Sequence, residues 1–200
     1  MTTIIGVQSE WGCSIYADGQ TTAGDYRPFS DPALRKVVKR GEYLLATAGP
    51  GAVSDAVAQG WMPPPFSGRD GYREMVTTVV PHLRRFLSKE LNYDMSPTVE
   101  GDKFTALIAV HGVIYEVEVD GTVLIHPDGL FGIGTGAPYA IGALYAGADI
   151  GSALRIAEVN DVYTGPPFVM EQQPKPGREV PTNDRSTDDD SSTEPADGEE

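Results

Sequence analysis

The sequence is poor in cysteine and in long apolar runs. Cys13 is the only cysteine among 200 residues, which excludes an intramolecular disulfide and a multi-cysteine metal site. No apolar run approaches the roughly 20 residues that cross a bilayer, and no basic segment followed by an apolar one opens the chain. We therefore expect a cytoplasmic protein with no membrane partner.

Several nucleotide and metal motifs are also missing. The three histidines, His82, His111 and His126, are dispersed, and there is neither a paired-histidine zinc motif nor a phosphate loop. The stretch GIGTG at 132–136 lacks the spacing and the strand–helix–strand context of a dinucleotide-binding fingerprint. The sequence indicates no organic cofactor.

Basic residues are few, and acidic residues gather at one end. The chain has 29 acidic and 15 basic residues, and residues 171–200 hold ten acids and three bases, which is half of the net charge of −14. Because the basic residues are scattered, we expect no nucleic-acid partner. The same stretch is rich in proline, serine and threonine and nearly lacks large apolar groups. We therefore place a folded domain at 1–172 and an acidic disordered tail at 173–200, either a solubilising segment or an interaction arm.

Apolar periodicity predicts segregated runs of strands and helices. Alternating patterns predict strands at 3–9, 12–18, within 36–49, and at 104–110, 113–119, 122–126 and 166–172. Helical patterns cover 51–60, 70–91 (with a kink or boundary at Pro81), 137–149 and 151–164. This order predicts an α+β fold in which two antiparallel sheets lie between helix pairs, a four-layer αββα sandwich.

Thr2 directly follows the initiator Met1 and could act as a nucleophile. Removal of Met1 would give Thr2 a free α-amine, whose unperturbed pKa is about 8, and a nearby cation would favour its deprotonated form. Threonine is inert without such a base. A lysine could supply the cation, and a buried lysine needs a carboxylate partner. Asp18 and Lys36 are the candidates.

Five short motifs carry a family resemblance. The chain resembles proteasome β-type subunits of the N-terminal nucleophile (Ntn) hydrolase superfamily, and most of all the HslV-type peptidases, over residues 2–170. The motifs occur in the family's order and near its spacing: TTIIGV at 2–7, YADGQTT at 16–22, RKV at 35–37, GPGAVSDA at 49–56 and IGTGAPYA at 133–140. The resemblance implies the proteasome-like αββα fold.

The resemblance also implies roles for the first candidates. It makes Thr2 the nucleophile, Asp18 the carboxylate that orients the lysine, and Lys36 the lysine that tunes Thr2. Taken singly, Asp18 could start a turn and Lys36 could be a solvated charge, but their joint occurrence favours a site. Extra residues in the segment 25–34 account for the displacement of Lys36 from the family pattern and favour it over Lys39.

Further roles follow from the same resemblance. Gly51 corresponds to the glycine whose N–H stabilises the oxyanion, with Gly49 as the alternative, since Pro50 between them departs from the family. Thr135 takes the place of a serine near the nucleophile's amine. Thr22 corresponds to the strand position whose backbone pairs with an extended substrate.

The segment NDVYT supplies the last candidates. Asp161 and Thr164 match the family's Asp-x-x-Ser element, which lies by the active site and contributes carbonyls to a bound cation. We therefore expect a structural monovalent or divalent cation near Glu158, Asp161 and Thr164. Capping of a helix end is the alternative reading of this element.

The implied function is that of a threonine-type endopeptidase. It would hydrolyse polypeptide substrates through a Thr2 acyl-enzyme, without a required cofactor, inside a homo-oligomeric ring, hexameric or heptameric, single or double, fed by an ATP-dependent unfoldase. Since methionine alone precedes Thr2, we expect an aminopeptidase to complete maturation. The alternatives are an Ntn amidase acting on small amides and a non-catalytic structural subunit of a proteasome-like ring that retains Met1.

Overall fold

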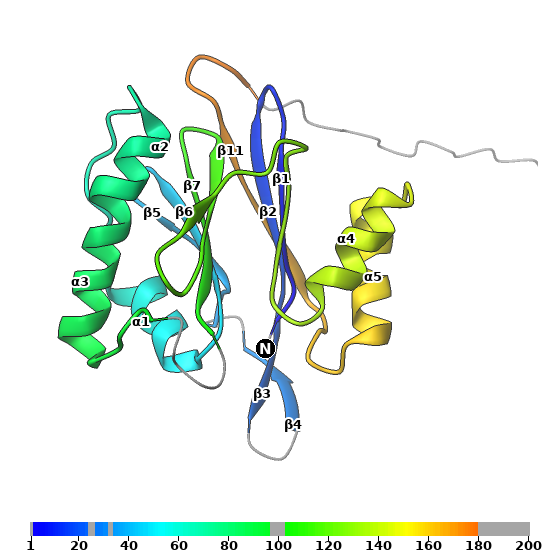
Figure 1. Cartoon of the computed structure of the whole chain (residues 1–200). Helices are drawn as coiled ribbons and strands as arrows, with labels where there is room; N and C mark the ends of the chain where they lie inside the picture. Colours follow the sequence, from blue (N-terminus) through cyan, green and yellow to red (C-terminus); the bar gives the residue numbers. More distant parts are fainter. Residues whose placement is uncertain (1, 24–26, 32–33, 97–102, 180–200) are drawn as a thin grey trace, which may run out of the picture.

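Two antiparallel sheets form the centre of the molecule (Figure 1). The computed structural model describes residues 2–23, 27–31, 34–96 and 103–179. The first sheet has the strand order β10-β1-β2-β11 and the second the order β5-β6-β7-β8-β9. The bounds are β1 Ile4–Gln8, β2 Gly12–Asp18, β10 Leu130–Ile133, β11 Phe168–Pro174, β5 Val37–Arg40, β6 Tyr43–Ala48, β7 Thr105–Val110, β8 Val113–Val117 and β9 Val123–Leu124. The predicted α+β class with antiparallel sheets is confirmed.

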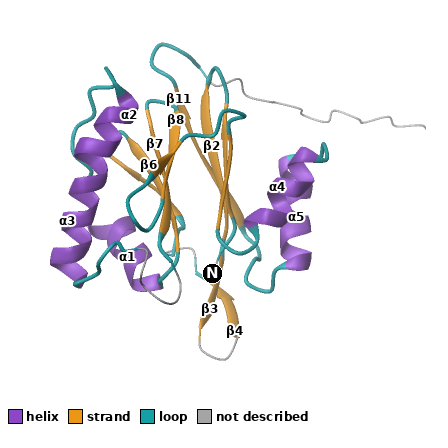
Figure 2. Ribbon diagram, viewed as in Figure 1, coloured by secondary structure: helices purple, strands orange, loops and turns teal. Residues whose placement is uncertain are grey.

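Helices cover the outer face of each sheet (Figure 2). One group comprises α1 Gly51–Gly60, α2 Gly71–Glu74 and α3 Val80–Leu91, and the other comprises α4 Ala137–Tyr145 and α5 Ile150–Asn160. A π-helical segment, Met75–Val79, joins α2 to α3 without a break. The helix therefore does not break at the boundary predicted at Pro81. Its hydrogen-bond pattern changes there from π-helical to α-helical, beside a residue that has no N–H to donate.

Three apolar clusters hold the layers together. The first lies between α1, α3 and the second sheet, the next joins the two sheets, and the last lies between the first sheet and α4 and α5. In β1, Ile4 belongs to the cluster between the sheets and Ile5 to the cluster against the helices. Since successive side chains of a strand point to opposite faces, a strand covered on both faces needs the continuous apolar run seen in this one.

A short ribbon projects from the sheets near Thr2 (Figure 1). It consists of β3 Gln20–Ala23 and β4 Arg27–Ser30, paired antiparallel. β4 lies within the segment 25–34, whose extra residues displace Lys36 from the family pattern. The ribbon leads from Asp18 in the first sheet towards Lys36 at the start of the second.

The C-terminal strand runs past the expected domain boundary. β11 continues to Pro174, two residues beyond position 172. The side chain of Gln173 accepts a hydrogen bond from Gly112 N and donates one to Glu42 O, and Lys175 N donates to Trp11 O. These contacts tie the first part of the expected tail to the domain, and its remainder, 180–200, lies outside the described residues.

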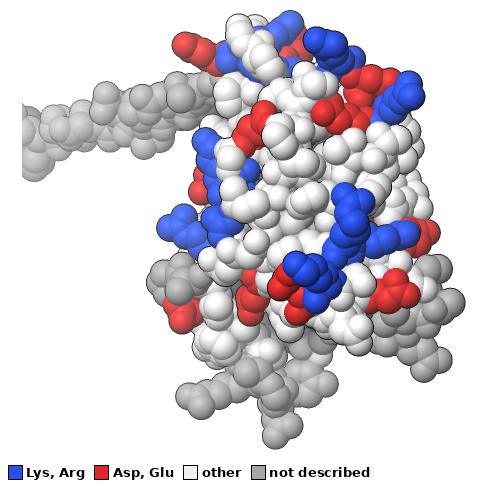
Figure 3. All heavy atoms as spheres, turned by 90° about the vertical axis from the view of Figure 1, so that its left-hand side faces the viewer, with Lys and Arg blue, Asp and Glu red and all other residues white. Residues whose placement is uncertain are grey.

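The face formed by α2 and α3 carries charges of both signs. Figure 3 shows basic and acidic residues interspersed over this side of the molecule, and α3 itself contains Arg84, Arg85, Lys89 and Glu90. The expectation that nucleic acid is not a partner stays a prediction. Within the described ranges, no helix combines the length and the apolar character that crossing a bilayer requires.

Candidate active site

The β1–β2 hairpin places Thr2 beside Asp18. Ile4 pairs with Ala17, and the pairing continues one step further, since Asp18 N donates to Thr3 O at 3.0 Å. The Thr2 hydroxyl then donates to Asp18 Oδ1 at 2.7 Å. The sixteen-residue separation of Thr2 and Asp18 is thus bridged by the register of a single hairpin.

The carboxylate of Asp18 is fully buried and surrounded by donors. Its Oδ1 atom accepts hydrogen bonds from Thr2 Oγ1, from Thr3 N at 2.8 Å and from Lys36 Nζ at 2.6 Å. Its Oδ2 atom accepts from Gln20 N at 3.2 Å and Gly165 N at 3.3 Å. A buried charge is tolerated when it is paired and hydrogen-bonded in this way.

Lys36 lies immediately before β5, and its side chain is only 14% exposed. Burial lowers the pKa of Lys36 below its ordinary value, against the opposing effects of the Asp18 charge and hydrogen bond and of the more distant Asp161. Lys39, the rejected alternative, lies within β5 with an exposed side chain. The structure therefore brings Lys36, and not Lys39, to Thr2 and Asp18.

A second group of polar side chains lies on the other side of Thr3. The hydroxyls of Thr3 and Thr164 are hydrogen-bonded at 2.5 Å. Thr164 Oγ1 donates to Asp161 Oδ2 at 2.7 Å, and Thr135 Oγ1 donates to the same oxygen at 2.8 Å. The three predicted residues Thr135, Asp161 and Thr164 are thus brought together, and they reach Thr2 through its chain neighbour Thr3.

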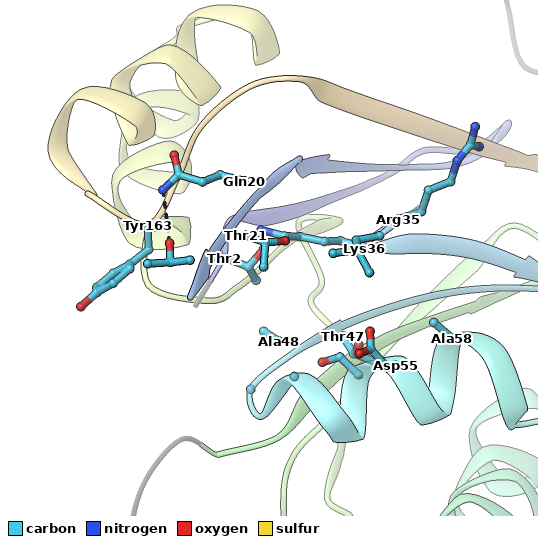
Figure 4. A pocket seen from close by; sticks show the side chains of 15 residues that line it. Thr2, Gln20, Thr21, Arg35, Lys36, Thr47, Ala48, Asp55, Ala58 and Tyr163 are labelled. Atoms are coloured by element: carbon cyan, nitrogen blue, oxygen red, sulfur yellow. Dashed lines mark hydrogen bonds between the residues drawn. The ribbon is translucent and has the colours of Figure 1, made fainter. Parts of the chain in front are cut away.

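A cavity of about 440 Å³ opens beside Thr2 (Figure 4). Its walls come from the segment that contains Lys36, from the end of β6 and from one face of α1. Among the lining residues are Thr2, Thr22, Lys36, Gly49, Gly51 and Tyr163. The predicted nucleophile therefore faces a space that can hold part of a substrate.

Both candidate oxyanion glycines line this cavity. Gly49 has a φ of +128°, and a side chain there would approach Lys103 O at 2.7 Å, so the tight bend requires glycine. Gly51 is the first residue of α1, and the first amides of a helix have no acceptor within it. An N–H with no acceptor among the described residues suits Gly51 to the donor role, which stays a prediction.

The backbone of Thr22 faces the open edge of the ribbon. Thr22 pairs with Pro28, and Gln20, two residues earlier on the same strand, pairs with Ser30. Gln20 N donates to Asp18 and so points away from β4, and residues two apart in a strand present their backbone groups to the same edge. Pro28 has no N–H to offer to the ribbon. Thr22 therefore has its N–H and C=O directed to where an extended peptide could pair.

The structure does not test the cation predicted near Glu158. Asp161 accepts from two hydroxyls and from Tyr163 N at 3.3 Å, and Glu158 is exposed on α5. In the part of the chain that the structure describes, no group of three or more histidine, cysteine or acidic residues is arranged to hold a metal. The cation stays a prediction.

Sequence reasoning missed Thr3 and the side chain of Gln20. Thr3 is fully buried and joins the Asp161 group to Asp18. Gln20 Nε2 donates to Val162 O at 2.8 Å and so ties β3 to the segment after α5. The doubled threonine was a visible signal for Thr3, since a second hydroxyl beside the first is costly to bury unless it is hydrogen-bonded.

Comparison with known proteins gives matches in structure only. No protein-family model matches the chain, and no curated protein matches it in sequence. BPH from Thiobacillus denitrificans, solved in complex with epoxomicin, superposes with a TM-score of 0.66 at 22% identity, covering 86% of this chain and 98% of BPH. HslV from Trypanosoma brucei gives a TM-score of 0.59 at 19% identity, covering 85% and 98%.

A third structure is Anbu, an ancestral beta-subunit, from Yersinia bercovieri. It gives a TM-score of 0.62 at 12% identity, covering 86% of this chain and 81% of Anbu. The chain therefore has the fold of the proteasome-type Ntn hydrolases. The resemblance drawn from its sequence motifs to the HslV type and its relatives is confirmed at the level of the fold.

Proposed function

We propose that this chain is an N-terminal threonine endopeptidase in which Thr2 becomes the nucleophile once Met1 is removed. The observation that carries the proposal is that one oxygen, Asp18 Oδ1, binds both the Thr2 hydroxyl at 2.7 Å and the Lys36 ammonium at 2.6 Å. Only Asp18 Oδ1 separates the Lys36 ammonium from the Thr2 hydroxyl. This nearby positive charge favours the uncharged form of the new α-amine.

The proposed reaction has two halves. In the first, Thr2 Oγ attacks the carbonyl carbon of a peptide, and its proton passes to its own α-amine. The N–H of Gly51 stabilises the oxyanion. Collapse of the tetrahedral intermediate breaks the C–N bond, the departing amine takes the proton, and an ester to Thr2 is left. In the second, the same amine activates water, which hydrolyses the ester and releases Thr2.

Under the proposal, the cluster of threonine hydroxyls that is hydrogen-bonded around Asp161 holds this site in place. Thr135 and Thr164 share Asp161 Oδ2, and Thr164 holds Thr3. The substrate lies along the open edge of β3 at Thr22 as an added strand. This arrangement would present a peptide backbone to Thr2 in an extended form.

We extend the proposal to assembly. The likeness to HslV, to BPH and to a protein described as an ancestral beta-subunit supports a four-layer αββα subunit that forms a cytoplasmic homo-oligomeric ring and accepts polypeptides from an ATP-dependent unfoldase. Since BPH is solved in complex with epoxomicin, we propose that epoxomicin binds here too.

The test combines intact mass with hydrolysis of fluorogenic peptides. We expect purified wild type to lack Met1 and to cleave peptides, Thr2→Ala to lose this activity, and Thr122→Ala, a matched change in the β8–β9 turn, to keep it. Epoxomicin should compete with peptide in the wild type. Retention of Met1 with no hydrolysis would favour the structural subunit, and turnover of small amides without peptides would favour the amidase.

A further inference from the structure

The cavity beside Thr2 has a wall made of small and polar residues. Gly51, Ser54, Asp55 and Ala58 line it from α1, and their spacing of three to four residues puts them on one helical face. None of these side chains is large, so α1 leaves the cavity open. At about 440 Å³ the cavity can hold a long side chain.

Among the described residues that line this cavity, three are charged, and two of these are already paired. Lys36 Nζ is bound to Asp18 at 2.6 Å. Arg35 extends away from the cavity (Figure 4), and its Nη1 lies 3.9 Å from Glu171 Oε1 on β11. Asp55 makes no ion pair with any residue that the structure describes. Of the charges that the described residues bring to the cavity, the one without a partner is therefore negative.

The neighbours of Asp55 suit a long cationic group. Figure 4 shows Asp55 and Thr47 on the wall across from Thr2 and Lys36. The head of a lysine or arginine has more N–H donors than one carboxylate accepts, and the hydroxyls of Thr47 and Ser54 can accept the others. The methyl groups of Ala48 and Ala58 can pack against a methylene stem, as the stems of lysine and arginine require.

We propose that this cavity takes the side chain preceding the scissile bond and selects lysine or arginine there, with Asp55 as the specificity-determining residue. This inference rests on the proposed function, because the carbonyl attacked by Thr2 puts the preceding side chain at the cavity. A glutamate at that position would meet Asp55, while Arg35 is engaged by Glu171.

The test uses peptides that differ only at the residue before the scissile bond. Arginine and citrulline match in shape and differ in charge, and glutamate is the opposite charge. We expect wild type to prefer arginine over citrulline about tenfold in kcat/KM, equivalent to about 1.4 kcal/mol. Asp55→Asn should bring this ratio close to one, while Glu90→Gln on α3, a matched loss of one exposed charge, should keep it.

Salt gives a second readout. Because Asp55 is exposed at the cavity wall, raising the salt concentration should shrink the ratio of arginine to citrulline in wild type and leave it unchanged in Asp55→Asn. Asp55→Lys should move the preference to glutamate.

The results distinguish this inference from the proposed peptidase function on which it rests. Thr2-dependent hydrolysis with equal rates for arginine and citrulline, an unchanged ratio in Asp55→Asn, or a wild-type preference for glutamate would overturn the role of Asp55 and leave the peptidase standing. Absence of hydrolysis of every peptide by protein that lacks Met1 would overturn both.

Discussion

Lys36 Nζ lies 2.6 Å from Asp18 Oδ1, and the two residues lie at the ends of strands in different sheets, Asp18 within one and Lys36 just outside the other. Asp18 ends β2 in the first sheet, while Lys36 immediately precedes β5 in the second. The ion pair therefore joins the two sheets at the point where Thr2 lies. A change in either residue should alter both the stability of the domain and the chemistry of Thr2.

Replacing Asp18 with asparagine should cost both activity and stability. The substitution keeps the shape of the side chain but leaves the Lys36 ammonium buried without its anion, and breaking a buried pair in this way costs about 3 kcal/mol. Peptide hydrolysis and urea unfolding measure the two effects. The double variant Asp18→Asn/Lys36→Met is the control, since it should recover part of the stability and none of the activity. Full peptide turnover by Asp18→Asn would reject its place in the site.

Lys36 should make the free energy of unfolding depend on pH on the alkaline side. Burial lowers the pKa of Lys36 in the folded state, so the unfolded chain binds more protons between that lowered value and the ordinary value of 10.5. The free energy of unfolding therefore rises with pH across this window. Urea unfolding of wild type and of Lys36→Met through the window measures the difference between them. We expect the wild type to gain relative to the variant, and a flat or falling difference would contradict the shift.

Gly136→Ala should disturb the cluster of threonine hydroxyls around Asp161. A side chain at Gly136 would collide with the hydroxyls of Thr3 and Thr164, and overpacking of this kind typically costs about 1 to 3 kcal/mol. We expect lower thermal stability and weaker peptide hydrolysis. Gly142→Ala in α4 is the control, because a side chain there meets nothing within 4 Å and helical propensity favours alanine. Equal behaviour of the two variants would contradict the packing argument.

Glu116→Gln should remove a pH dependence on the acidic side. Glu116 is only 7% exposed, and burial, reinforced by Glu118 and opposed by His126, raises its pKa above the ordinary 4.5. The folded state then binds more protons above pH 4.5, so this carboxyl's contribution to stability is lost as the pH rises through its folded pKa. Thermal unfolding from acid to neutral pH should show Glu116→Gln gaining on wild type. The exposed Glu90→Gln should run parallel to wild type.

Local patterns predicted most strands and helices, and distant packing decided the rest. Helix α1 has the bounds that its small-residue pattern predicted, Gly51–Gly60. Strand β10 was not predicted, because its Gly132 reads as a breaker. A side chain at Gly132 would approach Ile141 of α4 at 2.7 Å, so glycine is present there for close packing of a helix on the sheet. The residue that requires glycine there is nine positions further along the chain and comes close only in the folded protein, so the strand's own pattern does not reveal it.

The sequence predicted Thr2, Asp18 and Lys36 as neighbours, and it missed Thr3 as the partner of Thr164. Thr2 and Asp18 are joined by one hairpin, and Lys36 follows at the next strand. The bond between Thr3 and Thr164 spans 161 residues, and no local period relates two positions so far apart. The family motifs supplied Thr164 but did not supply its partner.

The order of the first sheet also sets when the environment of Asp18 is completed during synthesis. Gly165 N donates to Asp18 Oδ2 across 147 residues, and Phe168 of β11 pairs with Asp18. A ribosome releases the N-terminal hairpin early and this strand late. Until then the carboxylate lacks a donor and β2 lacks its outer neighbour, so the surroundings of Asp18 are finished only when β11 has been made.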